Sequence, residues 1–297
     1  MKKADLILTS DWHLRETTPV CHIGDFWEEQ WGGVIFIKDL QKEHNCPVLH
    51  AGDLFHHWKP SPYLLSYAIE WLPDQFHTIY GQHDLPQHNF EERHRSGIYT
   101  LEQAGALTVL PGVHWGQDPP MDNTLGVHVS DYVQRLYMVW HRMVWQGKRP
   151  WPGCTDPSAV ALLKKYKEYD LILTGDNHKP FTEEYEGRLL VNPGSLTRQV
   201  ADQIDHLPRV YLYDADSNAV DPVYLPIQKG DEVISRAHID KVEERDERIS
   251  AFITKLTGEW EIGLSFEDNL KKFFDSNKVL ESIKKIIYEA IDDENPA

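Results

Sequence analysis

The sequence contains little cysteine and no long apolar run. Its three cysteines, Cys21, Cys46 and Cys154, lie far apart and none belongs to a CxxC pair. This spacing argues against a disulfide framework and indicates free thiols in a reducing compartment. No stretch approaches the ~20 apolar residues of a membrane span. Asp5 and Asp11 also interrupt the apolar start that a secretory signal would need. We therefore expect a cytoplasmic protein with no membrane partner.

Basic charge is also scarce. Lysine and arginine together number 30, against 47 aspartates and glutamates, so the formal net charge is −17. This balance argues against a generally basic surface that holds nucleic acid. A polyanionic substrate would have to be held by metal ions, by local basic residues or by a partner. The 297 residues are enough for one substantial core and a small appended domain.

The sequence does contain a series of polar clusters, each of which follows a short apolar run typical of a β-strand. The pairs are residues 6–8 before Asp11 and His13, residues 48–49 before Asp53, residues 78–80 before Gln82, His83 and Asp84, residues 137–139 before His141, and residues 171–173 before Asp176 and His178. In open α/β sheets, ligands bind beyond the carboxyl ends of the strands. We therefore expect these side chains to converge on one site.

The order of the elements predicts an α/β fold. Residues 25–44 are expected to form a helix, and Ser61-Pro62 has the pattern of an N-cap followed by proline at the first helical position. Strand, helix, strand, helix, strand is the order of a parallel sheet. Beyond Pro180, residues 188–191, 210–213 and 223–225 predict an antiparallel meander that completes a second sheet packed on the first. From about Gly230 the pattern is charged and helical.

The residue types in the clusters suit a pair of divalent metal ions. Two ions roughly 3.5–4 Å apart can hold both the attacking and the leaving oxygen of a phosphoryl displacement. Such a pair needs a bridging carboxylate, for which Asp53 is the natural residue. The other ligands would be Asp11, His13, Gln82, His141, Asp176 and His178. Carboxylate, amide and imidazole together favour Mn²⁺, with Mg²⁺ or Fe²⁺ as alternatives, and the lack of thiolates argues against structural zinc.

His83 and Asp84 follow a metal ligand directly in the sequence. Phosphoester hydrolysis needs an acid that protonates the leaving oxygen, and an imidazole suits that role. A neighbouring carboxylate would orient the ring and hold it protonated near neutral pH. Any one of these residues, taken alone, is more simply explained as part of a capped turn. Five clusters in series favour the catalytic interpretation.

In their order, the clusters resemble the calcineurin-like metallophosphoesterase superfamily, whose motifs run DxH, GD, GNH(D/E), H and GHxH. The chain is most similar to the SbcD-type nucleases of double-strand-break repair, because residues 52–56 match their GDLFH and residues 81–84 nearly match their GNHD. The similarity covers roughly residues 4–225. It implies an α/β/β/α sandwich in a nuclease domain of residues 1–228, followed by a small helical extension of residues 229–297.

The resemblance also implies roles for single residues. One metal would be held by Asp11, His13, Asp53 and His178, and the other by Asp53, Gln82, His141 and Asp176. His83 takes the position of the catalytic histidine, and His56 that of a second histidine near the nucleotide. The chain departs from the family pattern twice, with Gln82 in place of Asn and Asp176 in place of the first His of GHxH. Both replacements still offer oxygen ligands.

Three further residues, Arg15, His88 and Arg198, are candidates for contact with a substrate phosphate, although ordinary surface positions explain each of them more simply. The implied function is a metal-dependent DNA phosphodiesterase of repair, recombination or phage DNA processing. Exonuclease activity is expected, and endonuclease activity is left open, in a bacterial cell or a phage-infected host. Family analogy adds a homodimer and an SbcC-like coiled-coil ATPase partner that the C-terminal helices would bind. The same helices would alternatively pack on the body of the protein.

Two alternatives stand beside this function. An enzyme of the same fold could act on small phosphodiesters or on phosphoproteins, and the acidic net charge favours that substrate class. A fold that had lost catalysis could serve as a scaffold. The nearly complete set of metal ligands argues against a scaffold.

Overall fold

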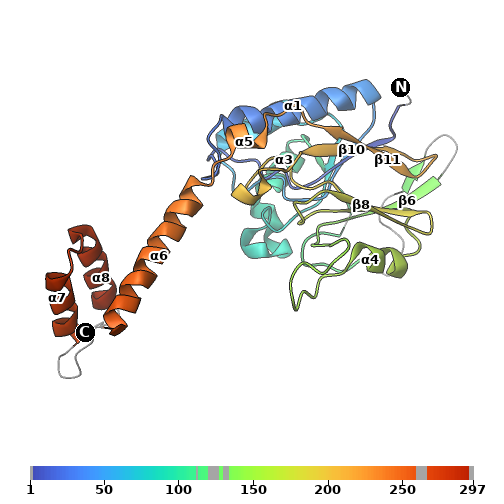
Figure 1. Cartoon of the computed structure of the whole chain (residues 1–297). Coiled ribbons are helices and arrows are strands. Elements are labelled where there is room, and N and C mark those ends of the chain that lie inside the picture. The colour runs from blue at the N-terminus through green and yellow to red at the C-terminus, as the bar shows by residue number, and fades with distance from the viewer. Residues whose placement is uncertain (1–2, 112, 120–126, 130–133, 259–265, 294–297) are drawn as a thin grey trace. The chain divides into compact units, whose positions relative to one another are not determined.

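The computed structural model describes residues 3–111, 113–119, 127–129, 134–258 and 266–293 (Figure 1). The chain divides into two compact units, one that ends at Ser235 and one that begins at Arg236. Each unit is described here by itself. The predicted boundary after residue 228 stays a prediction, because compactness does not test whether either part folds alone.

The first sheet contains six strands in the order β11-β10-β1-β2-β3-β4. These strands are β1 (Leu6–Thr9), β2 (Val48–His50), β3 (Phe76–Thr78), β4 (Thr108–Val109), β10 (Arg209–Asp214) and β11 (Ala219–Tyr224). The four strands β1 to β4 run parallel, while β10 pairs antiparallel with both β1 and β11. The carboxyl ends of β1, β2 and β3 therefore lie at one edge of the sheet.

The second sheet has the order β5-β6-β7-β9-β8. Its strands are β5 (Val127–Val129), β6 (Gln134–Trp140), β7 (Leu171–Thr174), β8 (Phe181–Tyr185) and β9 (Arg188–Asn192). The central three, β6, β7 and β9, run parallel, and β5 and β8 pair antiparallel at the two margins. Both sheets are therefore mixed, and the predicted α/β fold with two sheets is confirmed.

Successive side chains of a strand point to opposite faces of its sheet, and this alternation builds the layers of the fold. Leu6 and Leu8 of β1 point into a buried cluster shared with Val139, Leu171 and Leu173 of the second sheet. Ile7, between them in sequence, belongs instead to the cluster beneath the helices on the other face. The two sheets thus pack face to face, and each has helices on its outer face.

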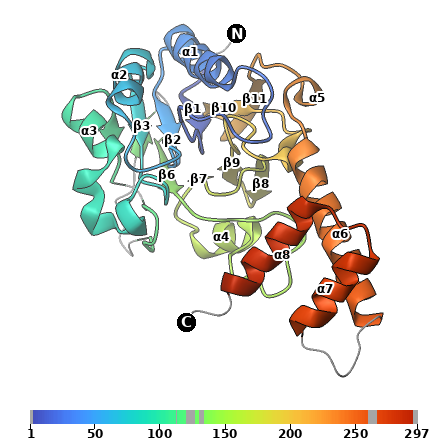
Figure 2. The same ribbon diagram turned by 90° about the vertical axis from the view of Figure 1, so that its left-hand side faces the viewer.

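The helices begin where the sequence provides caps. The Asp25 side chain accepts a hydrogen bond from the backbone N–H of Glu28 at the start of α1 (Phe26–His44), and Ser61 caps α2 (Pro62–Trp71) in the same way. With α3 (Gly97–Gln103), these helices cover the first sheet, while α4 (Ala159–Lys165) covers the second (Figure 2). Short helical turns complete the unit: η1 (Pro86–His88), η2 (Phe90–Arg95), η3 (Ala201–Gln203) and α5 (Gly230–Val233).

The expected meander after Pro180 is wrong in its pairing. Its three strands, β9, β10 and β11, do not complete the second sheet together. Only β9 joins that sheet, where it lies parallel to β7 and pairs with β8. The other two cross to the first sheet and extend it beyond β1. The expected antiparallel pairing holds for β10 and β11. The segment between residues 192 and 209 is long enough to pass from β9 in one sheet to β10 in the other.

The second unit consists of helices α6 (Ala237–Gly258), α7 (Phe266–Ser276) and α8 (Glu281–Asp293). Leu270, Phe273 and Phe274 form its small buried cluster, against which Val279 and Ile287 pack. Within the described residues of the whole chain, no helix is both long and apolar enough to cross a membrane.

Candidate metal centre

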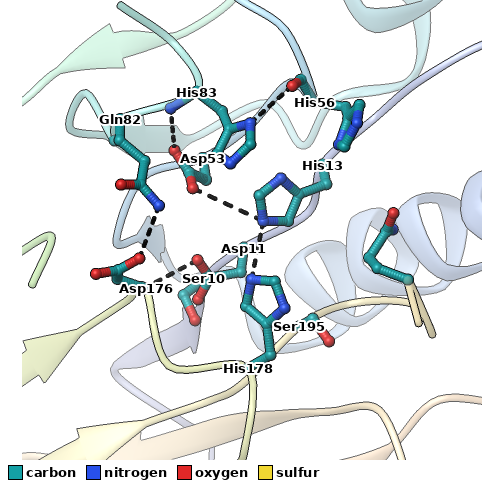
Figure 3. Close-up of polar contacts among 12 residues, drawn as sticks. Ser10, Asp11, His13, Asp53, His56, Gln82, His83, Asp176, His178 and Ser195 are labelled. Atoms are coloured by element: carbon teal, nitrogen blue, oxygen red, sulfur yellow. Dashed lines mark hydrogen bonds and ion pairs between the residues drawn. The ribbon is translucent and has the colours of Figure 1, made fainter. Parts of the chain in front are cut away.

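The polar clusters come together at the carboxyl ends of five parallel strands. Asp11 and His13 lie beyond β1, Asp53 beyond β2, and Gln82 and His83 beyond β3 in the first sheet. His141 follows β6, and Asp176 and His178 follow β7 in the second. Because the two sheets face each other, these loops meet from opposite sides (Figure 3). The predicted convergence is therefore seen in the structure.

Several of these residues have a left-handed backbone. The φ angles are 52° at Asp11, 46° at His13, 57° at Asp53 and 72° at Asp176. This region costs a residue with a side chain roughly 1–2 kcal/mol relative to the right-handed region, and such residues gather at functional sites. The sharp turn at the end of each strand is what directs these side chains into the centre.

Glycines allow the loops to approach closely. A Cβ atom on Gly81 would overlap the Oδ1 and backbone N atoms of Asp53. On Gly52 and Gly175 it would lie 2.6 Å and 2.8 Å from the Nδ1 atom of His141. The close approach of these loops, between the sheets at Gly52 and within one sheet at Gly81, therefore requires glycine.

Three buried ligand atoms at the middle of the centre have no hydrogen-bond partner. The carboxylates of Asp11 and Asp53 and the imidazole of His141 offer ligand atoms within 4.8 Å of one another. Asp11 Oδ2, Asp53 Oδ2 and His141 Nε2 are buried without a hydrogen bond. His141 Nδ1 donates to the carbonyl of Ala51 at 2.7 Å, so its Nε2 faces Asp53 Oδ2 at 3.4 Å. Buried polar atoms without a partner are costly, and a divalent cation fits these donors.

Burial and charge set the protonation of this group. Burial disfavours a charged histidine, but Asp53, Asp11 and Asp176 outweigh it and raise the pKa of His141 to about 10. Burial would raise the pKa of Asp53, but His141 and His13 hold it below its ordinary value. The pKa of Asp11 is raised, chiefly by burial. In this arrangement a histidinium compensates the carboxylates, a role that bound cations would take over.

A second ligand group shares Asp11. His13 and His178 offer ring nitrogens within 4.8 Å of its carboxylate. The two Nε2 atoms of His13 and His178 face each other at 3.1 Å, and His13 Nε2 lies 3.7 Å from Asp53 Oδ2. The backbone N–H of Asp176 donates to Asp11 Oδ1 at 3.0 Å, which fixes the carboxylate between the two sheets. This group contains three of the four residues that were expected to hold the first metal ion, and that assignment stays a prediction.

The two departures from the family pattern contact each other. Gln82 Nε2 donates to Asp176 Oδ1 at 2.8 Å (Figure 3). Gln82 is one methylene longer than Asn, and Asp176 is shorter than His, so the longer side chain meets the shorter one. Rotation of the amide about its last bond would present oxygen instead of nitrogen. The two residues are therefore in contact, and their role as ligands of a second metal ion stays a prediction.

His83 and His56 lie beside this centre. The backbone N–H of His83 donates to Asp53 Oδ1, and its ring Nδ1 donates to the carbonyl oxygen of His56, each at 2.8 Å. The His83 ring stacks on that of His56 with centroids 5.4 Å apart. Its Nε2 is the ring atom left for a reacting group.

The predicted role of Asp84 is not the one that the structure shows. Its carboxylate accepts backbone N–H groups of Asp53, Leu54 and Phe55, at 2.8, 3.2 and 3.1 Å, and of Gly81 at 3.0 Å. It is buried, and burial together with the charge of Asp53 raises its pKa to about 7. Asp84 thus fastens two loops together, while a carbonyl oxygen orients the His83 ring.

The three predicted phosphate contacts differ in their surroundings. Arg15 is half-buried, and its guanidinium donates to Thr17 and Gln199. His88 is exposed, and its ring nitrogen bonds to the carbonyl of Gln82 at 2.9 Å.

Arg198 is 1% exposed. It donates to the carbonyls of His206 and Gln228 and lies 3.7 Å from Glu29. This placement contradicts a substrate contact by Arg198, because its guanidinium is already held inside the fold.

Comparison with known proteins finds a matching family model and a similar protein. A family model described as the calcineurin-like phosphoesterase superfamily domain matches residues 5–216. The DNA double-strand break repair protein Mre11 of Haloferax volcanii is 27% identical over 249 residues, which are 72% of this chain and 52% of that protein. The chain thus spans about half the length of this relative.

Solved structures with a similar arrangement have low identity to the chain. One is a novel archaeal phosphodiesterase, with 14% identity and a TM-score of 0.41, covering 74% of this chain and 99% of that one. Another is a variant of Vps29 from Entamoeba histolytica, with 15% identity and a TM-score of 0.35, covering 74% and 98%.

Proposed function

The chain belongs to the calcineurin-like phosphoesterase superfamily, and we propose that it is a metal-dependent DNA phosphodiesterase. The observation that carries this proposal is the convergence of Asp11, Asp53 and His141, whose facing ligand atoms are buried without a hydrogen-bond partner. We propose two ions, with Mn²⁺ as the first choice. The proposed activity is that of an exonuclease in repair, recombination or phage DNA processing.

In this proposal the chain's own residues hold two metal ions, and the ions bind the substrate phosphate. One ion would be held by Asp11, His13, Asp53 and His178, and the other by Asp53, Gln82, His141 and Asp176. When bound, two such ions would neutralise phosphate charge and activate a water molecule. Asp84 keeps the Asp53 loop against the Gly81 loop through its four backbone hydrogen bonds.

His83 is the proposed proton donor. Because its Nδ1–H donates to the carbonyl of His56, the proton that can be gained and lost is the one on Nε2. That proton would pass to the 3′-oxygen as the phosphorus–oxygen bond breaks. General acids of this kind contribute roughly 10²–10⁴-fold to the rate.

The substrate class rests on one relative and one sequence match. The similarity to the Mre11 protein of Haloferax volcanii and the GDLFH match at residues 52–56 support DNA. The net charge of −17 favours the alternative, a small phosphodiester or a phosphoprotein, because an acidic surface repels a nucleic acid.

The test is hydrolysis of end-labelled linear DNA with Mn²⁺ or Mg²⁺ by the wild type, His83→Ala and His57→Ala. His57 is exposed and next to His56, so it is a matched control. We expect cleavage by the wild type and the control, and a loss of at least about 100-fold in His83→Ala with metal still bound. Equal cleavage by all three proteins would refute the role of His83.

A small chromogenic phosphodiester, given to the same three proteins, separates the alternatives. Hydrolysis of that compound together with intact DNA would favour the small-substrate enzyme. Fewer than one metal ion per chain in protein grown with manganese would favour the scaffold.

Two proposals about partners follow from the resemblance. We propose that an SbcC-like coiled-coil ATPase binds the second unit and that the chain forms a homodimer. A pull-down with residues 240–297 deleted tests the first, because a partner that stays bound would refute it. Light scattering of the full chain tests the second.

A further inference from the structure

Three imidazoles form a cluster on one side of the metal centre. His13, His56 and His83 offer ring nitrogens within 4.8 Å of one another. Their ring centroids are separated by 4.8 Å for His13 and His83, 5.4 Å for His56 and His83, and 5.9 Å for His13 and His56. All three residues lie in loops of the first sheet, beyond β1, β2 and β3, and Figure 3 shows the rings grouped together.

The cluster contains nitrogens that lack partners. His13 Nδ1 and His56 Nδ1 are buried without a hydrogen bond. His83 Nδ1 is occupied by the carbonyl of His56, so its Nε2 remains. A buried polar atom without a partner costs roughly 1–3 kcal/mol. The cluster is therefore suited to bind a metal ion, which accepts lone pairs from several imidazoles at once.

The donor type determines which ion fits. The dinuclear centre is rich in carboxylates, which suits Mn²⁺ or Mg²⁺, whereas imidazole suits Zn²⁺. Three imidazoles and an open fourth position are a known zinc arrangement in proteins. We propose that His13, His56 and His83 form a zinc-binding site that consists of imidazoles alone, unlike the dinuclear centre.

Occupation of this site would affect the reaction, a consequence that rests on the proposed function. Zinc on His83 would take the ring nitrogen from which the proton is donated. His13 belongs to both ligand groups, so zinc would also share or compete for its ring. Zinc is thus expected to inhibit hydrolysis that Mn²⁺ supports. The binding itself does not depend on the substrate.

The test measures binding rather than activity. In full-length protein, Asp53→Asn removes the charge that bridges the dinuclear centre, and Zn²⁺ is then titrated against a chromogenic chelator. His56→Gln and His57→Gln are added separately in this background, and near-ultraviolet circular dichroism checks that each variant is folded. We expect one zinc per chain with His57→Gln and at least about tenfold weaker binding with His56→Gln, since even changes outside the direct ligands cost 10–100-fold.

A second measurement avoids the Asp53 substitution. Co²⁺ added to otherwise wild-type protein absorbs visible light strongly only when four-coordinate. That band is expected in the His57→Gln protein and absent from the His56→Gln and His83→Gln proteins. Equal zinc affinity or equal cobalt bands in His56→Gln and His57→Gln would overturn the site. Zinc binding without inhibition would keep the site and refute the role of His83 instead.

Discussion

At the scale of single residues, Gln82 and Asp176 form a pair across the two sheets. Their hydrogen bond of 2.8 Å joins a loop after β3 to a loop after β7. A shorter Asn at position 82 would withdraw from Asp176, and a His at position 176 would meet the longer Gln82. The two replacements are therefore expected to depend on each other.

We predict that Gln82→Asn and Asp176→His each weaken Mn²⁺ binding by about tenfold, which corresponds to about 1.4 kcal/mol. The double variant, which restores the residues of the family pattern, is expected to bind within about threefold of the wild type. Calorimetric titration of all four proteins measures the coupling, which for residues in contact is typically about 0.5–3 kcal/mol. If the losses of Mn²⁺ binding free energy in the two single variants added up in the double variant, the two residues would act independently of each other.

His114 is a second residue with a testable consequence. Its Nδ1 accepts the backbone N–H of Tyr80 at 3.1 Å, and its ring stacks on Phe90. Burial first, and then the charge of Arg93, lower its pKa from 6.5 to about 4. Because the unfolded chain binds the proton more readily, the contribution of His114 to stability is fully present above pH 6.5. It is lost as the pH falls from 6.5 towards 4.

We predict that His114→Asn, whose side-chain oxygen can accept the same N–H, loses less stability on acidification. The difference between wild type and variant should reach about 3 kcal/mol between pH 7 and pH 4, at 1.36 kcal/mol per pKa unit. Urea unfolding at several pH values measures it. Parallel pH curves for the two proteins would show that His114 titrates normally.

Asp84 shows what could not be predicted from the order of residues. Its place next to His83 in the sequence indicated a carboxylate that orients the imidazole, but in the structure the carbonyl of His56 bonds to that ring. Three of its four partners are backbone N–H groups about 30 positions earlier in the chain, at residues 53–55. A carboxylate accepts from whichever donors the fold brings near, and adjacency in sequence does not determine them.

At the scale of elements, helix caps and apolar periods predicted most helices and the strands of the parallel sheet. Asp25 and Ser61 start α1 and α2 as expected. The distribution of strands between the sheets could not be predicted. A strand's pattern reports which of its faces is buried, but it does not identify the partner strand: β9 and β10 both begin with Arg followed by an apolar run, and they belong to different sheets.

Two glycines in helices provide a matched pair of substitutions. A Cβ on Gly32 of α1 would meet nothing within 4 Å, whereas on Gly97 of α3 it would lie 2.6 Å from Pro60 Cδ. We predict that Gly32→Ala stabilises the protein by about 0.5–1 kcal/mol, because alanine loses less backbone entropy in a helix.

Gly97→Ala is expected to destabilise the protein by about 1–3 kcal/mol, because the ring of Pro60 is rigid and cannot move aside easily. Both values come from urea unfolding monitored by circular dichroism. If Gly97→Ala stabilised the protein instead, the loop at Pro60 would have to move to make room for the added methyl group.

At the scale of the whole molecule, the candidate ligands come from both sheets of the first unit. Ions bound there would connect the loops of β1, β2 and β3 to those of β6 and β7. We predict that Mn²⁺, at about 100 times its dissociation constant, adds about 2.7 kcal/mol to the free energy of unfolding for each ion bound. For a protein of this size that is a rise of roughly 5–10 °C in the unfolding temperature.

A chelator should reverse the rise, and Asp53→Asn should largely abolish it. Differential scanning calorimetry with and without Mn²⁺ measures both. An equal rise in the Asp53→Asn protein would place the stabilising ions elsewhere.

The left-handed backbone at Asp11, His13, Asp53 and Asp176 has an evolutionary consequence. Each position carries a conformational cost that glycine would remove. Under the proposed function, selection for hydrolysis opposes that replacement, because glycine has no side-chain ligand atom. In a lineage released from such selection, selection for stability alone would favour glycine at these four positions. The buried apolar residues around them would be retained. Glycine at these four positions in descendants of this chain would therefore identify the proteins that have lost the proposed activity.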